Sequence, residues 1–130
     1  SACLVGSEMC IRDRVVENAT IMDGGIAIST CPKDMPNNML IAAQAADALL
    51  SIKGIQASFV LAETPGGINI SGRSLGQINV QLILERIGGG GHLAVAGAQL
   101  KDISINEAVD KLTDSIYSYL DEIGADYTRS

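Results

Sequence analysis

Four consecutive glycines followed by a histidine, Gly88 to His92, form the stretch of this sequence that is best suited to chemistry. Because glycine has no Cβ, successive backbone N–H groups can turn toward one point and approach a ligand closely. Phosphate oxygens suit several converging donors. His92 adds a side-chain donor, and a neighbouring phosphate would favour its charged form. The run therefore predicts a phosphate-binding turn.

Arg73 is the natural partner of this turn. It lies at the end of a predicted polar strand face, is followed by Ser74, and precedes the helix that leads into the glycines. A guanidinium group can bind phosphate through two parallel hydrogen bonds, which a point charge cannot do. Arg73, the glycine amides and His92 would together give local positive potential within an acidic domain.

Each of these features also has an ordinary structural interpretation. Four glycines can form a flexible linker, although linkers are usually bounded by polar residues and both flanks here are apolar. A lone histidine is more often structural than functional, and Arg73-Ser74 could be a solvated strand end. Taken together, the three features favour a phosphate site.

The sequence offers no catalytic set of its own. His92 is the single histidine, and no His, Cys, Asp or Glu cluster has metal-ligand spacing. No Ser-His-Asp set can be argued, and the glycine run lacks the Gly-Lys-Ser/Thr ending of a Walker motif. We therefore expect this chain to hold a phosphate without hydrolysing it alone, and to bind no metal itself.

Composition excludes several classes of protein. The chain has 130 residues, of which 47% are hydrophobic, and its 15 Asp and Glu against 9 Lys and Arg give a net charge of −6. This suits one compact domain rather than a disordered tail, and no apolar run reaches the ~20 residues of a membrane span. The negative charge and the scarcity of aromatic residues argue against a clamp for long nucleic acid.

The N-terminal segment resembles a translated cloning or sequencing adapter more than natural protein sequence. Leu4 to Asp13 can be reverse-translated into ten codons that resemble one reading frame of a transposase sequencing adapter. We expect residues 1–14 to be adapter-derived, with the natural sequence resuming near Val15 and more protein upstream. Cys3 and Cys10 fall in that segment, so we expect Cys31 to be a buried small hydrophobic residue of a reduced protein.

The elements that must position the candidate site follow from periodicity. Two short strands flanking Asp23-Gly24-Gly25 indicate a hairpin, and Ala-rich periodicity indicates a helix over 38–52, ended by Gly54. A buried strand is predicted over 56–63, followed by a turn at 64–67. The alternation over 68–73 then places Asn69, Ser71 and Arg73 on the polar face of the next strand.

The second half of the chain carries two helices around the glycine run. Asn79 is a suitable cap for a helix over 80–87, and a strand is predicted over 96–100. Ser104 and Glu107 form a capping box for the last helix, whose apolar stripe runs from Ile105 to Ile123. We therefore expect one compact α/β domain, a mixed β-sheet with about three packed helices.

The motif Gly88–His92, followed by Leu-Ala-Val-Ala-Gly, resembles the signature of the DHH-associated domain of DHH-family phosphoesterases. The flanking residues 70–81, together with Gln99 and Leu100, are most similar to the GdpP-type cyclic-di-AMP phosphodiesterases. The resemblance covers 15–124 as a substrate-binding domain and leaves 125–130 as a tail. Where the family has Ala between Ser and Arg, this chain has Gly72.

The resemblance implies roles for seven residues. Arg73 and His92 would contact the substrate phosphate, the amides of Gly89, Gly90 and Gly91 would lie beside it, and Ser71 and Ser74 are weaker assignments. The two divalent metals, manganese in most of the family, would be held by a DHH domain outside this chain. The metals would support the opening of cyclic di-AMP to linear pApA.

The same resemblance implies partners and location. The expected partners are a cyclic dinucleotide or a short oligonucleotide phosphate, the DHH domain of the same protein, and a second copy in a homodimer. We expect a cytoplasmic domain of a membrane-anchored protein. The alternatives are a nanoRNase that is also a pAp-phosphatase, a RecJ-like exonuclease fragment, or a stand-alone nucleotide-binding module.

Overall fold

The computed structural model describes Val15 and residues 19–22, 25–31, 38–64, 66–76 and 78–123. The segment 1–14 and the tail 125–130, which the sequence analysis set apart, lie outside the described residues. Within these residues the elements are, in order, β1 (Thr20–Met22), β2 (Ile26–Cys31), α2 (Asn38–Leu50), β3 (Ala57–Thr64), β4 (Gly67–Ser74), α3 (Val80–Glu85), β5 (Gly90–Gly91), β6 (Val95–Leu100) and α4 (Ile105–Glu122).

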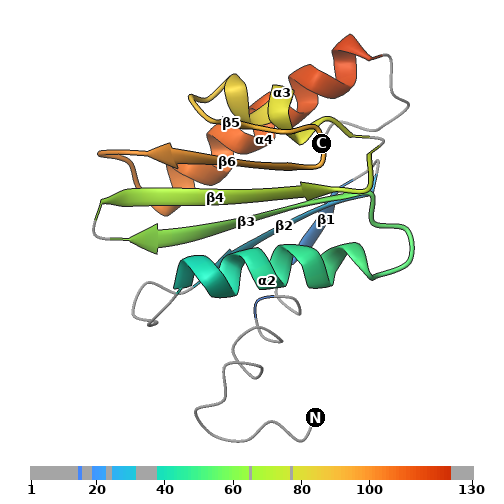
Figure 1. Cartoon of the computed structure of the whole chain (residues 1–130). Coiled ribbons are helices and arrows are strands. Elements are labelled where there is room, and N and C mark those ends of the chain that lie inside the picture. Colours follow the sequence, from blue (N-terminus) through green and yellow to red (C-terminus); the bar gives the residue numbers. More distant parts are fainter. Residues whose placement is uncertain are drawn as a thin grey trace, which may run out of the picture.

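The described strands form one mixed sheet in the order β1-β2-β3-β4-β6-β5. Strands β2 and β3 pair in parallel, and the other neighbouring strands pair antiparallel. The helix α2 covers one face of this sheet, and α3 and α4 cover the other (Figure 1). The predicted α/β class, a single mixed sheet with three packed helices, is confirmed.

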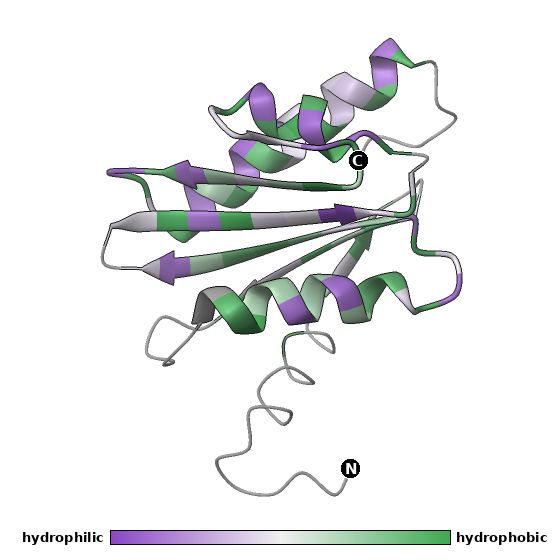
Figure 2. Ribbon diagram, in the orientation of Figure 1, coloured by the Kyte–Doolittle hydropathy of each residue, from purple (hydrophilic) through white to green (hydrophobic). Residues whose placement is uncertain are grey.

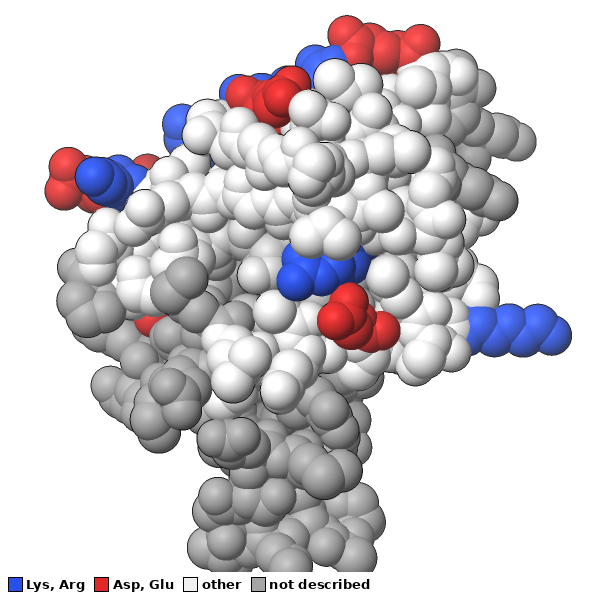
Figure 3. All heavy atoms as spheres, in the orientation of Figure 1, with Lys and Arg blue, Asp and Glu red and all other residues white. Residues whose placement is uncertain are grey.

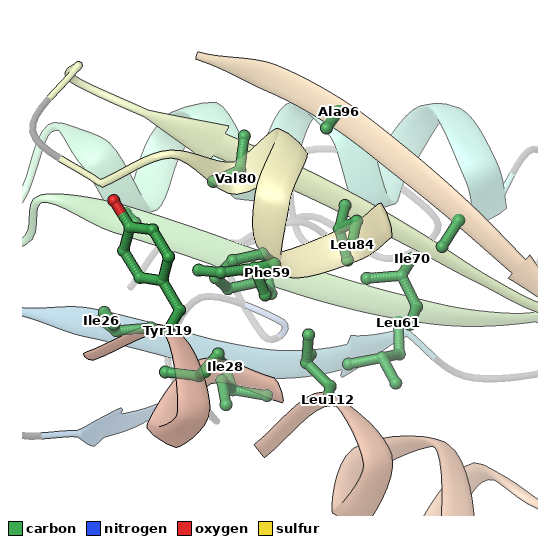
Figure 4. Close-up of a cluster of buried hydrophobic side chains, with 14 of the residues drawn as sticks. Ile26, Ile28, Phe59, Leu61, Ile70, Val80, Leu84, Ala96, Leu112 and Tyr119 are labelled. Carbon is green, nitrogen blue, oxygen red and sulfur yellow. The ribbon is translucent and has the colours of Figure 1, made fainter. Parts of the chain in front are cut away.

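Alternating side chains of the strands supply the two cores. On the α3/α4 face, Phe59 and Leu61 of β3 pack with Ile70 of β4, Leu84 of α3 and Leu112 of α4 (Figure 4). On the α2 face, the small buried side chains of the helix bring it close to β2 and β3. Figure 2 shows the corresponding banding of polar and apolar residues along β4 and α4. Burial of these apolar faces is the main driving force for the fold.

Most predicted elements are confirmed, with small differences at their ends. The capping box is present, since Ser104 Oγ accepts from the Glu107 amide at 3.2 Å. The helix α3 ends at Glu85 instead of 87, and the strand β5 was not predicted because glycines carry no side-chain pattern. Ile52 and Ile123, predicted on apolar stripes, lie beyond the ends of their helices and are exposed.

Candidate functional site

The strand β4 presents Arg73 on the face predicted for it. The burial of successive residues alternates along β4, so that Ile68, Ile70 and Gly72 are buried and the residues between them are half-buried. Period-two alternation therefore puts Asn69, Ser71 and Arg73 on the face that α2 partly covers.

Arg73 has a partner that the sequence analysis missed. Its Nε lies 3.3 Å from Oδ1 of Asp47 on α2, and its Nη1 donates to the Gly72 carbonyl at 3.1 Å. The Arg73 side chain is 19% exposed and that of Asp47 is 67% exposed. The sequence held only a weak indication of this ion pair, namely that Asp47 is the single charged residue of α2. Arg73 is thus held at the sheet surface instead of extending into solvent.

The glycine run is an edge strand with a tight turn. Gly90 pairs with Gly97 and Gly91 with Ala96, and the His92 amide donates to the Val95 carbonyl at 2.7 Å. A Cβ at Gly89 would come within 2.4 Å of the Gly97 carbonyl oxygen, and one at Gly91 within 2.5 Å of Ala96 Cα. A Cβ at Gly90 would meet nothing within 4 Å. A Cβ at Gly88 would also meet nothing, although the positive φ of Gly88 favours glycine there. The run is therefore a packed turn in which Gly90 is an open position without a positive φ, and a flexible linker is excluded.

Most backbone amides of the run are already engaged. The Gly88 amide donates to the Glu85 carbonyl at 3.2 Å, and the Gly89 amide donates to the Leu84 carbonyl at 2.7 Å. Because His92 and Val95 are hydrogen-bonded, the alternation of an antiparallel ladder assigns the Gly90 amide to Gly97 and directs the Gly91 amide to the outer sheet edge. The run is therefore not a nest of converging free amides, and Gly89 contributes shape rather than a donor.

A shallow groove lies beside the run. It has a volume of about 460 Å³ and is lined by Ser71, Asn69 and Gln99 together with the backbone of Gly88 to Gly90 and Gly97. The row Ser71–Gly97–Gly90 across β4, β6 and β5 consists of small residues, so nothing large stands above the sheet there. The groove is therefore a place where a ligand can approach the sheet closely.

The sheet register relates Arg73 to His92. Arg73 pairs with Val95, and Val95 accepts from the His92 amide, so the three residues occupy one row. This row lies two positions along the strands from the row of small residues, on the same face of the sheet. His92 is exposed. In Figure 3 most charged groups on the visible face lie along its rim, and one adjoining blue and red pair stands amid uncharged surface. The structure thus brings Arg73, Ser71, Gly90 and His92 to neighbouring positions of the sheet.

Ser74 does not join this group. It follows Arg73 on β4, so its side chain belongs to the opposite face, where it is buried. Its hydroxyl accepts from the Gly76 amide at 2.9 Å and stabilises the turn after the strand. Strand alternation separates consecutive residues, so Ser74 lies on the face opposite to Arg73, and its substrate contact stays a prediction.

The described residues offer no alternative centre of metal or thiol chemistry. Among them, no three His, Cys, Asp or Glu side chains lie close enough to hold a metal ion. Cys31 is buried, as predicted, and burial raises the pKa of its thiol above the ordinary value of 9.0. No helix in this part of the chain is long and apolar enough to span a membrane.

Comparisons with known proteins bear on the family of this chain. Residues 23–122 match the model of the DHHA1 domain. The chain is 52% identical over 109 residues to "Cyclic-di-AMP phosphodiesterase PdeA" of Listeria monocytogenes, covering 83% of this chain and 17% of the relative. It is 43% identical over 111 residues to "Cyclic-di-AMP phosphodiesterase GdpP" of Geobacillus thermodenitrificans, covering 85% of this chain and 17% of the relative.

A solved structure shares the fold. An exopolyphosphatase-related protein from Bacteroides fragilis superposes with a TM-score of 0.77 at 23% identity, covering 90% of this chain and 36% of the other. The chain spans about a sixth of the length of the two phosphodiesterases. The family resemblance read from Gly88–His92 and its flanks is thereby confirmed: this chain belongs to the DHHA1 domain family.

Proposed function

We propose that this domain binds the phosphate of a dinucleotide for a DHH-family phosphodiesterase, and that the substrate is cyclic di-AMP, opened to linear pApA. The observation that carries the proposal is the open position at Gly90. It borders a groove on the sheet face that also bears Arg73 and Ser71. The names of the two phosphodiesterase relatives support the choice of cyclic di-AMP.

Each residue has a distinct part in the proposed site. The Arg73 guanidinium donates to two phosphate oxygens and offsets their charge. The Ser71 hydroxyl donates from the groove wall, and His92 donates from the same register row as Arg73. Gly90 leaves room for the phosphate above the sheet. Gly89 and Gly91 keep the turn tightly packed on β6. These groups bind and orient the substrate.

The metal belongs to another part of the longer protein in this proposal. The described residues do not fit a metal site, so no chemical step is assigned to a metal held here. A manganese-binding DHH domain, a cytoplasmic position and a membrane anchor stay predictions from the resemblance, as does a homodimer.

Two alternatives from the same superfamily differ in substrate length. A nanoRNase with pAp-phosphatase activity would bind a short linear oligonucleotide at the same groove, and a RecJ-like exonuclease would bind a long strand. The net charge of −6 disfavours the long strand. A stand-alone binding module would bind the dinucleotide without any cleavage in the longer protein.

Binding is tested by adding cyclic di-AMP, and separately inorganic phosphate, to the ¹⁵N-labelled chain. We expect the amide resonances of Ser71, Gly90 and His92 to shift. Arg73→Ala should weaken binding about tenfold or more, because a charge-assisted pair is lost. The matched control Lys101→Ala removes one positive charge at the opposite end of β6 and should bind as wild type. Equal binding by Arg73→Ala and wild type would refute the site.

Turnover is tested in the longer protein that includes a metal-holding domain. We expect linear pApA as the first product from cyclic di-AMP, with turnover strongly reduced by Arg73→Ala. His92→Ala should weaken substrate binding while the fold is kept. Preference for a linear dinucleotide over the cyclic one would favour the nanoRNase alternative, and absence of cleavage with intact binding would favour the binding module.

A further inference from the structure

The pair between Asp47 and Arg73 is not explained by the stability of α2. Asp47 lies in the last turn of the helix, where the backbone dipole is negative and a carboxylate is unfavourable. The side chain is exposed and could be replaced by a stronger helix former. Its position is instead explained by Arg73, whose Nε lies 3.3 Å away.

The backbone around Asp47 is fixed to the sheet. Ser58 of β3 is the register partner of Arg73 on β4, and its buried hydroxyl donates to the Ala46 carbonyl of α2 at 2.6 Å. The residue after Ala46 is Asp47. Three elements thus meet at one point, and the carboxylate is presented to the guanidinium from a rigid support.

Counting the hydrogen-bond donors of Arg73 shows which of them remain available to a ligand. A guanidinium has five N–H donors, one on Nε and two on each Nη. The Nε atom forms the ion pair with Asp47, and one Nη1 proton goes to the Gly72 carbonyl. Among the described residues, the remaining Nη1 proton and both Nη2 protons of Arg73 have no partner. The Nη1–Nη2 edge of the guanidinium, which can bind phosphate through two hydrogen bonds, therefore still has donors available, and the ion pair fixes its direction.

We propose that Asp47 is a positioning residue: it holds the Nε edge of Arg73 so that the Nη1–Nη2 edge is preorganised for an incoming phosphate. This inference rests on the proposed phosphate-binding function. A long side chain that is already ordered loses less conformational entropy on binding. Asp47 therefore raises phosphate affinity although it carries a negative charge.

The sign of the mutational effect tests the proposal. Simple electrostatics predicts that any loss of the Asp47 charge increases the affinity for an anion. Preorganisation predicts that Asp47→Ala weakens binding of inorganic phosphate about threefold to tenfold, the cost of ordering one flexible side chain. Asp47→Asn keeps an oxygen that accepts from Nε–H and removes the charge, so it should bind phosphate as well as or better than wild type.

The experiment measures phosphate affinity of the full chain by ¹⁵N titration for wild type and both variants. Asp110→Ala is the control, because it removes another exposed carboxylate, from α4 on the other face of the sheet. The Arg73 Nε–H resonance provides an independent readout. It should be protected from exchange in wild type and Asp47→Asn, and lost in Asp47→Ala.

The outcomes separate this inference from the proposed function. Weaker binding by Asp47→Ala, with wild-type or tighter binding by Asp47→Asn, supports a positioning role. Equal or tighter binding by both variants, while Arg73→Ala still weakens binding about tenfold or more, overturns the role of Asp47 and leaves the site intact. Phosphate binding that Arg73→Ala does not change overturns both.

Discussion

At the scale of single residues, the glycines of the Gly88–His92 turn do different things. Gly89 and Gly91 lie so close to β6 that any Cβ would collide with its backbone, whereas Gly90 faces open space. A φ of +99° at Gly88 is a further position that favours glycine, at the point where the chain leaves α3. Packing therefore explains Gly89 and Gly91, backbone conformation explains Gly88, and the open space at Gly90 is left for a ligand.

Substitution at Gly90 and Gly89 separates binding from folding. Gly90→Val should leave the free energy of unfolding nearly unchanged, because the side chain enters free space on a strand, and should strongly weaken dinucleotide binding by filling that space. Gly89→Ala should cost about 1–3 kcal/mol of stability through overpacking. Urea denaturation and cyclic di-AMP titration measure the two effects. Unaltered affinity in Gly90→Val would contradict a ligand at this position.

Cys31 gives a residue-scale prediction for pH dependence. Burial raises its thiol pKa in the folded state above 9.0, so the unfolded chain ionises first as the pH rises. Its contribution to stability is therefore complete below pH 9 and is lost as the pH increases toward the folded pKa, by at most about 1.4 kcal/mol per pH unit. The stability difference between wild type and Cys31→Ala, measured by urea denaturation from pH 7 to 10, should fall above pH 9. A constant difference would contradict this.

At the scale of elements, α4 fixes α3, and α3 in turn fixes the glycine turn. Ser115 Oγ donates to the Ile83 carbonyl at 2.6 Å, and the Asn79 amide donates to Tyr119 Oη at 3.0 Å. The last turn of α3 then accepts from the Gly89 amide. The short helix is thus a connector between the long helix and the groove.

Tyr119→Phe tests this connection. Losing the acceptor for the Asn79 amide should lower the free energy of unfolding by about 1 kcal/mol and speed hydrogen exchange of the Gly89 amide. Ser118→Ala, which removes an exposed hydroxyl from the same helix, is the control and should change neither quantity. Unchanged exchange at Gly89 in Tyr119→Phe would show that α3 is held by its apolar packing alone.

At the scale of the whole molecule, the groove exists because α2 covers only part of one face of the sheet. The helix α2 packs on β2, β3 and β4, whereas the groove lies over β4, β6 and the glycine turn. Where the groove lies, the face that α2 leaves uncovered carries the small residues Ser71, Gly97 and Gly90. A polar ligand can therefore be received there without exposing the core.

The overall charge sets the length of nucleic acid that this surface can bind. With a net charge of −6 and no basic stripe along the groove, additional phosphates beyond the first should gain nothing. We expect a 20-nucleotide single strand to bind no more tightly than a dinucleotide in fluorescence anisotropy at fixed salt. Affinity that increases with strand length would favour the RecJ-like alternative.

Local sequence patterns were enough to predict most of the helices and strands. The strand alternation around Arg73, the capping box at Ser104 and the apolar stripe of α4 depend on near neighbours in the chain, and all three are confirmed. The strand β5 escaped prediction because pairing with β6, rather than any side-chain pattern of its own, makes Gly90–Gly91 a strand.

The sequence by itself determined the family, the α/β class and the face on which Arg73 lies, because motif and periodicity are local properties of the chain. The tertiary structure alone decided that Asp47 meets Arg73. It also decided that the glycine amides are mostly used within the fold and that Gly90 borders a groove. These features depend on contacts between residues far apart in sequence, such as α2 with β4 and the glycine turn with β6. They arise only when the sheet assembles and fixes which backbone groups remain unpaired.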